Sequence, residues 1–309
     1  HVFEATSISS VIPKISNTTI PRVYESYWNK NLTAAVFRYM KDEAGTISNF
    51  AAEMRKVPVN ASSSPADRIP YEVKGKFLSQ NVKEVAVSPK GDRIFTLEIE
   101  DGKGVGYISG FDESKKTRVF DTPLTQVNID WPEENTLSLS TKASATASGY
   151  FYLVDLKKPV VKRIIGGITG LSAKASADAK KVLFSSVSPR GFTTNIFNTK
   201  DNSVQEVVFK TTVDKCVWSK KNMNWVFCSV PMEFPLGTYP DDWYRGNMSF
   251  ADQIWHLDTT TGELHLIANL LKMSNQLMDA VGLVLDPKED FLYFMNKKDL
   301  TLWSLDLRP

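Results

Sequence analysis

One turn returns along the chain at a nearly constant spacing, and this repetition constrains the fold more than any other feature. The copies are WNKNLTAAVF from Trp28, SPKGDRIF from Ser88, WPEENTLSL from Trp131, SADAKKVLF from Ser176, SKKNMNWVF from Ser219 and DPKEDFLYF from Asp286. The middle copies follow one another at steps of about 43 to 45 residues, whereas the last step is about 67 residues. Apolar residues precede each turn and a β-rich run follows it, so each copy predicts a β-hairpin.

A second turn repeats in phase with the first and carries an Asp or Asn, whose short side chain bonds nearby backbone. The residues concerned are Asp112, Asp155, Asn198, Asp258 and Asp306. Two hairpins per repeat give four strands, and repeats of this length and strand count are typical of a β-propeller. A β-sandwich would not predict such regular spacing. We therefore predict an all-β chain, a single β-propeller domain over residues 1–309 with four-stranded antiparallel blades.

The ends of the chain decide how the blades are counted. In the second blade, strands a to d, from the centre outward, are expected near 82–88, 93–100, 105–111 and 117–122. The chain ends soon after the Asp306 turn, so the last blade lacks strand d. Because an open edge favours aggregation, residues 1–21 are expected to supply closing or partial-blade strands ahead of the repeated blades of 22–309. A simple count gives six blades.

Several strings resemble a known group of proteins. SPKGDRIF and DPKEDFLYF resemble the turns of TolB-like and WD-repeat-like propellers. Longer strings, SNTTIPRVYESYW (16–28), KCVWS and VFCSVP (within 215–231), YPDDWYRGNMSFADQIW (239–255) and KKDLTLWSLDL (297–307), are similar to uncharacterised, membrane-anchored surface propellers of bacteria. The resemblance spans the chain and implies a location outside the cytoplasm, with no established activity. In that group a string like HVFEA (1–5) is a late strand of an earlier blade, which favours seven blades with the first incomplete.

Composition removes some classes of function. With 37 basic and 35 acidic residues the net charge is +2, and no basic block indicates nucleic-acid binding. No stretch approaches the roughly 20 apolar residues of a membrane helix, so contact with a membrane is expected only through an anchor absent from this chain. The sequence begins at His1 without a signal-type run, which indicates a removed targeting or anchoring segment or a fragment.

The two cysteines carry information about the compartment. Centring the turn of the fifth blade on Asn222 places Cys216 opposite Cys228 in an antiparallel pair, at a separation that permits a disulfide. The alternative is a pair of buried free thiols. A disulfide indicates an oxidising, exported location, so we expect an extracellular or cell-surface protein.

Motifs for catalysis are missing. The sequence has no G-x-S-x-G elbow, phosphate-binding loop or zinc-type spacing, so we predict no cofactor, no metal and no enzyme. His256 and His265 are read as ordinary strand positions. A carbohydrate-active propeller would use paired carboxylates at the channel mouth. The candidates are Glu98, Glu100, Asp101, Asp130, Asp241 and Asp242, although solvated loop and turn positions explain them more simply.

One insertion explains the long last step. PMEFPLGTYPDDWYRGNMSF, residues 231–250, separates strands b and c of the fifth blade. The other b–c connections, at 41–45, 101–104, 142–149 and 188–191, are shorter, and a second long segment, 57–71, delays the first blade. Binding loops usually sit on a rigid scaffold of this kind. The insertion is expected on one rim with the other b–c loops, leaning over the channel mouth.

The insertion supplies most of the predicted binding residues, since Tyr, Trp and Arg are enriched at binding hot spots. They are Tyr239, Asp241, Asp242, Trp243, Tyr244 and Arg245, together with Arg190 from the 188–191 connection. The alternative is a lid whose aromatic residues turn inward, because a long ordered loop needs a core of its own. Both hold if only some aromatics are buried and Tyr244 or Arg245 stays exposed.

These observations predict a non-catalytic cell-surface or envelope binding module that recognises a surface protein or a glycan through the b–c loop face. Two alternatives remain open. One is a carbohydrate-active propeller enzyme, a hydrolase or lyase, with carboxylates at the channel mouth. The other is a structural subunit of a surface assembly.

Overall fold

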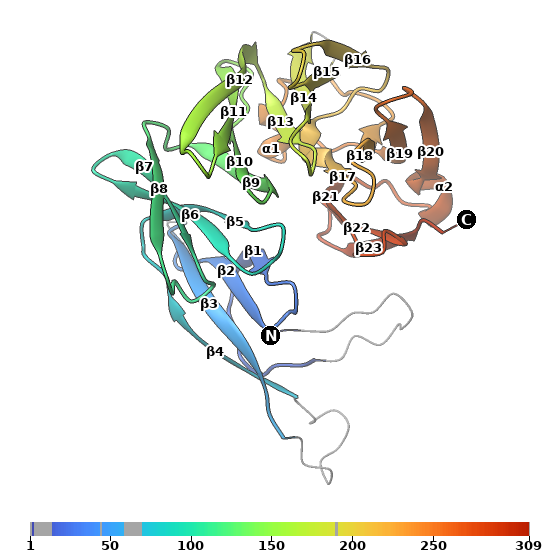
Figure 1. Cartoon of the computed structure of the whole chain (residues 1–309). Helices are drawn as coiled ribbons and strands as arrows, with labels where there is room; N and C mark the ends of the chain where they lie inside the picture. The colour runs from blue at the N-terminus through green and yellow to red at the C-terminus, as the bar shows by residue number, and fades with distance from the viewer. Residues whose placement is uncertain (1, 3–13, 44, 59–69, 189–190, 309) are drawn as a thin grey trace. The chain divides into compact units, whose positions relative to one another are not determined.

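The computed structural model describes residues 2, 14–43, 45–58, 70–188 and 191–308. Within these residues the backbone forms six antiparallel sheets, five of four strands and one of three (Figure 1). Neighbouring strands in each sheet are neighbours in sequence. The fold is therefore an all-β propeller with six blades, the number that we gave as the alternative; seven blades are not seen.

The first three blades have four strands each. Blade 1 holds β1 (Val23–Trp28), β2 (Ala34–Met40), β3 (Ile47–Lys56) and β4 (Tyr71–Phe77). Blade 2 holds β5 (Val82–Val87), β6 (Ile94–Glu100), β7 (Lys103–Ser109) and β8 (Thr117–Thr122). Blade 3 holds β9 (Val127–Glu133), β10 (Thr136–Thr141), β11 (Ser148–Asp155) and β12 (Val160–Thr169).

The last three blades include the short helical elements. Blade 4 holds β13 (Ser172–Ala175), β14 (Lys181–Ser188), β15 (Gly191–Asn198) and β16 (Val204–Val207). Blade 5 holds β17 (Cys216–Trp218), β18 (Trp225–Pro231), β19 (Asp252–Asp258) and β20 (Leu264–Asn269), with the 3₁₀ helix η2 (Val213–Lys215) before β17 and α1 (Asp241–Tyr244) before β19. After α2 (Leu270–Ser274), blade 6 holds β21 (Ala280–Leu285), β22 (Phe291–Asn296) and β23 (Leu302–Asp306).

The chain divides into two compact units. Unit 1 is His1–Thr125 with Leu156–Pro159 and contains blades 1 and 2. Unit 2 is Gln126–Asp155 with Val160–Pro309 and contains blades 3 to 6, which run from green to red in Figure 1. The prediction of one domain over 1–309 stays a prediction.

The strands of the second blade lie where the sequence predicted them, within two residues at each end. The recurring turns close through the polar residues that mark them. Ser88 Oγ accepts the backbone N–H of Arg93 at 3.1 Å, and Ser176 Oγ accepts that of Lys181 at 3.0 Å. At the second turn, Asp112 Oδ1 accepts the N–H of Ser114 at 3.0 Å.

The chain ends fit the predictions only in part. The last blade has no fourth strand within the described residues, as predicted. Blade 1, which begins at β1, is complete, and the earlier, incomplete blade of the seven-blade count would fall on residues 1–5. Residues 1 and 3–13, on which the expected closing strand falls, lie outside the described residues. Residues 14–16 lie beside β4, because Ser16 forms a parallel bridge with Tyr71. The 57–71 segment joins β3 to β4 and lies mostly outside the described residues as well.

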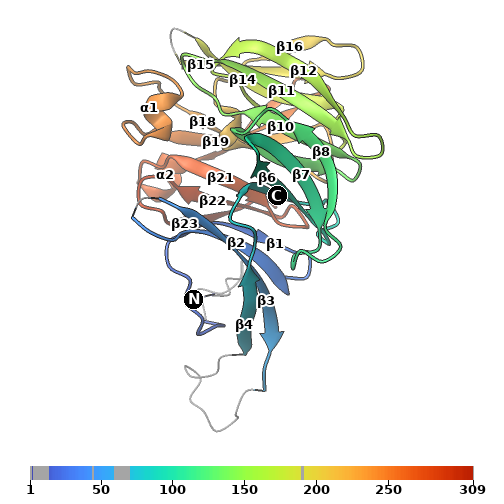
Figure 2. The ribbon, with the colours of Figure 1, turned by 90° about the vertical axis from the view of Figure 1, so that its left-hand side faces the viewer.

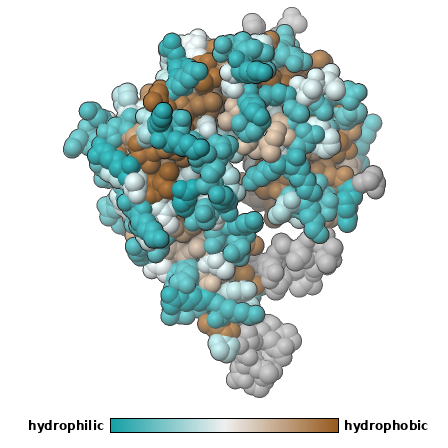
Figure 3. Space-filling view, in the orientation of Figure 1, coloured by the Kyte–Doolittle hydropathy of each residue, from teal (hydrophilic) through white to brown (hydrophobic). Residues whose placement is uncertain are grey.

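In unit 2 each pair of adjacent blades shares a hydrophobic core. Phe151 of blade 3 packs with Leu171 and Phe184 beside it. Leu183 of blade 4 packs with Trp218 of blade 5, and Ile254 of blade 5 packs with Phe294 of blade 6. The surface drawn in Figure 3 is mostly hydrophilic, with smaller hydrophobic areas between. No helix of the described residues is long and apolar enough to cross a membrane.

The cysteines form the predicted disulfide. Cys216 on β17 lies directly opposite Cys228 on β18, with the Cα atoms 4.1 Å apart, and Trp218 lies opposite Val226. The alternative of two free thiols is wrong, since neither cysteine is free. Both side chains are buried between blades 4 and 5.

We expect alkylation in denaturant without reductant to add no label to the chain, and alkylation after reduction to add two, as measured by mass. Replacing both residues, Cys216→Ala with Cys228→Ala, should lower the free energy of unfolding by about 2–3 kcal/mol, because the cross-link closes a short loop in the unfolded chain. Two labels before reduction would contradict the disulfide.

Candidate functional site

The lid loop, residues 231–250, leaves the scaffold between β18 and β19 and carries the short helix α1 (Figure 2). Four of its five aromatic residues turn inward, as the lid alternative predicted, whereas Tyr244 stays partly exposed. Tyr239 is 7% exposed and Trp243 is 3% exposed, and they pack with Phe250 and with Phe192 of blade 4. In this arrangement other rings cover most of Tyr239 and Trp243. A direct role for them in binding stays a prediction.

Blade 4 accommodates the lid loop through a glycine. Gly191 has a positive φ of 112°, which favours glycine. A Cβ atom at this position would lie 2.6 Å from the ring of Phe234. The ring therefore packs where only glycine leaves room. Arg190, the predicted binding residue next to it, lies outside the described residues.

The two adjacent aspartates of the lid loop hold its shape. Asp241 Oδ2 accepts the backbone N–H of Ala145 at 2.6 Å, which ties α1 to the b–c loop of blade 3. Asp242 accepts the N–H of Thr238 at 2.7 Å and the side-chain amide of Asn247 at 3.1 Å. These two bonds lower the pKa of Asp242. The insertion therefore lies with the b–c loops of blades 3 and 4, and its predicted place over the channel mouth stays a prediction.

A buried lysine, Lys215, holds the lid loop in place through its contact with a buried aspartate. Its Nζ lies 2.7 Å from Asp252 and 2.5 Å from Asp279, and all three side chains are fully buried. Asp279 Oδ2 also accepts the indole N–H of Trp243 at 2.9 Å and the backbone N–H of Phe250 at 3.1 Å. Lys215 thus links blade 5 to the start of blade 6 through Asp279, and Asp279 in turn binds the lid loop at Trp243 and Phe250.

Burial raises the pKa of Asp252, and the nearby Lys215 only partly offsets this effect. Two carboxylates share one ammonium, and Asp252 Oδ1 has no hydrogen-bond partner among the described residues. A carboxylate pair with one raised pKa is what an acid–base enzyme needs. Because this pair is fully buried, no substrate reaches it, and its role is structural.

Sequence reasoning did not find this anchor. Each of its charged residues stands at the start of an apolar strand: Lys215 before CVW, Asp252 at the start of β19 and Asp279 before β21. The sequence signal for this anchor was a charged residue at the start of a buried strand or directly before it. The sequence alone could not show that the three positions meet.

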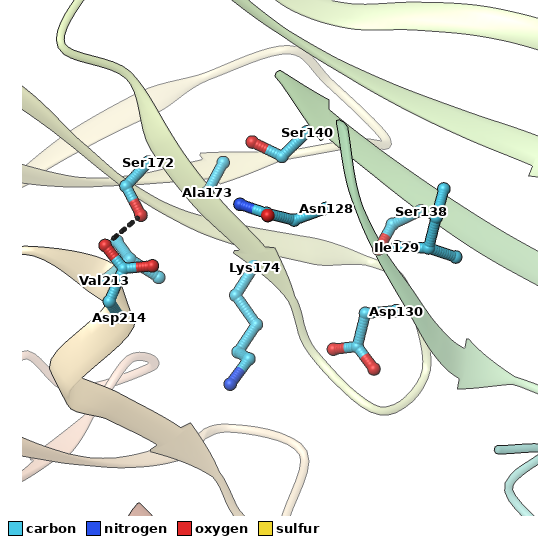
Figure 4. A pocket seen from close by; sticks show the side chains of 10 residues that line it. All are labelled: Asn128, Ile129, Asp130, Ser138, Ser140, Ser172, Ala173, Lys174, Val213 and Asp214. Atoms are coloured by element: carbon cyan, nitrogen blue, oxygen red, sulfur yellow. Dashed lines mark hydrogen bonds between the residues drawn. The ribbon is translucent and has the colours of Figure 1, made fainter. Parts of the chain in front are cut away.

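An open polar cavity of about 370 Å³ lies on the inner strands of unit 2 (Figure 4). Its lining comes from β9, β10, β13 and η2: Asn128, Ile129, Asp130, Ser138, Ser140, Ser172, Ala173, Lys174, Val213 and Asp214. Asp130 was among the carboxylates selected from the sequence, whereas Lys174 and Asp214 were not. The cavity places two carboxylates and one ammonium in the same lining.

Asp214 connects the cavity to the lid loop. Its Oδ2 accepts the hydroxyl of Tyr244 at 2.6 Å, that of Thr212 at 2.8 Å and that of Ser172 at 3.1 Å. Burial of the Tyr244 hydroxyl and the charge of Asp214 raise the pKa of Tyr244 far above its usual value. The tyrosine as a whole is still 43% exposed.

The other candidates have local partners. Glu98 pairs with Lys116 at 2.6 Å, and Glu100 accepts the hydroxyl of Tyr107 at 2.7 Å, both in blade 2. Asp101 occupies the β6–β7 turn with a positive φ of 48°. The simpler explanation, that these are turn and loop positions, fits Asp101, whereas Glu100 is the last residue of β6 and Glu98 is buried.

The two histidines and Arg245 are the last residues from the sequence analysis to be placed in the structure. His256 and His265 face each other across β19 and β20, at the strand positions expected for them. Arg245 is exposed and lies 3.9 Å from Asp241. It is therefore open to contact with a partner.

We expect Lys215→Met to lower the free energy of unfolding by about 3–5 kcal/mol, because it leaves buried carboxylates without their cation. Amide hydrogen exchange across 239–250 should become faster, since Asp279 no longer holds a fixed position under Trp243. Lys220→Met, at an exposed position, is the matched control and should change stability by less than about 0.5 kcal/mol. Equal effects of the two variants would contradict the anchor.

Asp252 should give stability a pH dependence of its own. Between the ordinary aspartate pKa, about 4, and the raised value, the folded state binds more protons than the unfolded state, so stability falls as pH rises. Wild type should therefore lose stability relative to Asp252→Asn between pH 4 and pH 8. Urea denaturation of both proteins across this range measures the difference, and parallel curves would show that Asp252 does not titrate in this way.

Comparison with known proteins identifies the fold only. No family model and no curated protein matches the chain. Among solved structures, an acylaminoacyl peptidase is 12% identical, with 93% of this chain and 45% of that chain covered and a TM-score of 0.59. The β-propeller domain of the Trilobed protease from Pyrococcus furiosus is 10% identical, covering 93% and 83%, with a TM-score of 0.57.

TolB from Acinetobacter baumannii also matches, at 12% identity, covering 78% of this chain and 53% of that chain, with a TM-score of 0.49. The chain spans about half the length of the peptidase and of this TolB. At such low identity, similarity shows fold and not activity. The chain is a β-propeller, in agreement with the resemblance found in its sequence.

Proposed function

We propose that the chain is a non-catalytic recognition module of the cell envelope that binds a surface or envelope protein through the b–c loop face of unit 2. The observation that carries this proposal is the fixed lid loop beside an open polar cavity. Lys215, Asp241 and Asp242 hold the loop in one shape, and Asp214 joins it to the cavity. A preformed surface binds with less loss of conformational entropy.

A protein partner fits this face better than a glycan. Sugars commonly stack on exposed aromatic rings, but Tyr239, Trp243 and Phe250 are covered. Tyr244 and Arg245 are exposed, and both residue types are enriched at protein interfaces. The disulfide supports an exported location, since such bonds persist in oxidising compartments.

The second candidate is a carbohydrate-active enzyme. It is favoured by Asp130 and Asp214, which line one cavity. Against it, three hydroxyl groups already donate to Asp214 Oδ2, so this oxygen is engaged in the protein's own hydrogen bonds. We therefore favour recognition without catalysis.

Purified chain should capture a partner from envelope extract, and the double variant Tyr244→Ala with Arg245→Ala should bind the purified partner at least tenfold more weakly. Trp243→Ala is a poor test, because Trp243 is buried and its loss would disturb the lid loop. Lys200→Ala, exposed in the β15–β16 turn, is the control and should bind like wild type.

A glycan array is run in parallel with the same variants. Binding to an array sugar without any protein partner would show that the ligand is a glycan. Equal partner binding by the double variant and wild type would contradict the assigned face.

A further inference from the structure

The cavity beside the lid loop carries an excess of negative charge. Asp130 and Asp214 line it with only one cation, Lys174. Part of that cation is already engaged, because Lys174 Nζ donates to the carbonyl of Cys216 at 3.3 Å. An anionic ligand would therefore meet two carboxylates, whereas a ligand with one positive charge would balance the lining.

Both carboxylates keep a free oxygen. The three hydroxyl donors of Asp214 all bond Oδ2, so Oδ1 has no donor among the described residues, and Figure 4 shows it pointing into the cavity. Asp130 Oδ1 accepts the N–H of Trp131 at 2.9 Å, and no donor to Oδ2 lies within the part of the chain that the structure describes. Each carboxylate thus offers one acceptor to a ligand.

A hydroxyl in the cavity lining provides an independent sign of a ligand. Ser138 as a residue is 3% exposed and lines the cavity, and its hydroxyl makes no hydrogen bond in the described part of the chain. Its oxygen is not among the fully buried atoms that lack a partner, so it faces the cavity and is available to a ligand. The side-chain amide of Asn128, also in the lining, has no described partner either.

The lining also includes three apolar residues, Ile129, Ala173 and Val213, and the stems of Lys and Arg bury readily against protein surface. The volume of 370 Å³ lies at the lower end of the usual range for ligand sites, about 300–1,000 Å³. It suits a single side chain.

We infer that this cavity receives a cationic side chain, lysine or arginine, from the protein partner, with Asp214 Oδ1 and Asp130 Oδ2 accepting its N–H donors. The inference rests on the proposed function and adds the chemistry of the group that is recognised. Ser138 and Asn128 then bond the remaining polar atoms of that side chain or of its backbone.

The test uses small probes and the whole chain. Nα-acetyl-lysine N-methylamide and its arginine counterpart are titrated by NMR, with the norleucine amide as an uncharged control. At least one cationic probe should bind, and the norleucine amide should bind at least tenfold more weakly. Asp130→Asn and Asp214→Asn should each weaken the cationic probe at least tenfold, whereas Asp201→Asn, in an exposed turn, should not.

Equal binding of the norleucine amide, or unchanged binding by both Asn variants, would overturn the inference. Tighter binding of glucosamine than of either amino-acid probe would also overturn it, in favour of an amino sugar. Asp130→Asn leaves the bond between Tyr244 and Asp214 intact, so its effect does not depend on the lid loop.

The inference and the proposed function can fail separately. If wild type captures a protein partner and both Asn variants bind it equally well, the face is correct and the cavity assignment is wrong. If the cationic probes bind but no protein partner is captured, the cavity chemistry stands and the proposed function loses its support.

Discussion

The ion cluster around Lys215 determines how the functional face of unit 2 is built. A lysine without contact to water needs counter-charges and hydrogen bonds around it, and here Asp252 and Asp279 supply them from two blades. Asp279 also accepts bonds from Trp243 and Phe250, so the same charges that join the blades position the lid loop. The long insertion is thereby part of the scaffold and not a mobile appendage.

Much of the fold was predictable from the sequence, because each hairpin is fixed locally. Turn residues such as Ser88 and Asp112 bond backbone a few positions away, and β-rich runs lie on both sides of them. The disulfide followed from the same register. The placement of Asp214 and Lys215 was not predictable, because their partners are remote in sequence and only the packing of blades brings them together.

The lid loop shows why residue type alone selects a site poorly. Its aromatic residues drew attention as binding candidates, but an ordered loop of this length needs an apolar interior, and Tyr239 and Trp243 provide it. The groups that remain available are polar and less conspicuous in the sequence. Ser138 and Asn128 lie on regular strands that a motif search passes over, and they become candidates only because they line an open cavity.

Three consecutive residues, Asp214, Lys215 and Cys216, face a cavity, a buried anion pair and a cross-link. A slip of one residue in one direction would place Asp214 between the two buried carboxylates, and a slip in the other direction would place Lys215 in the cavity. The cross-link to Cys228 excludes both slips, because it fixes which residue of β17 faces β18. The disulfide therefore fixes the register of this segment, which keeps Asp214 at the cavity and Lys215 at the buried carboxylates.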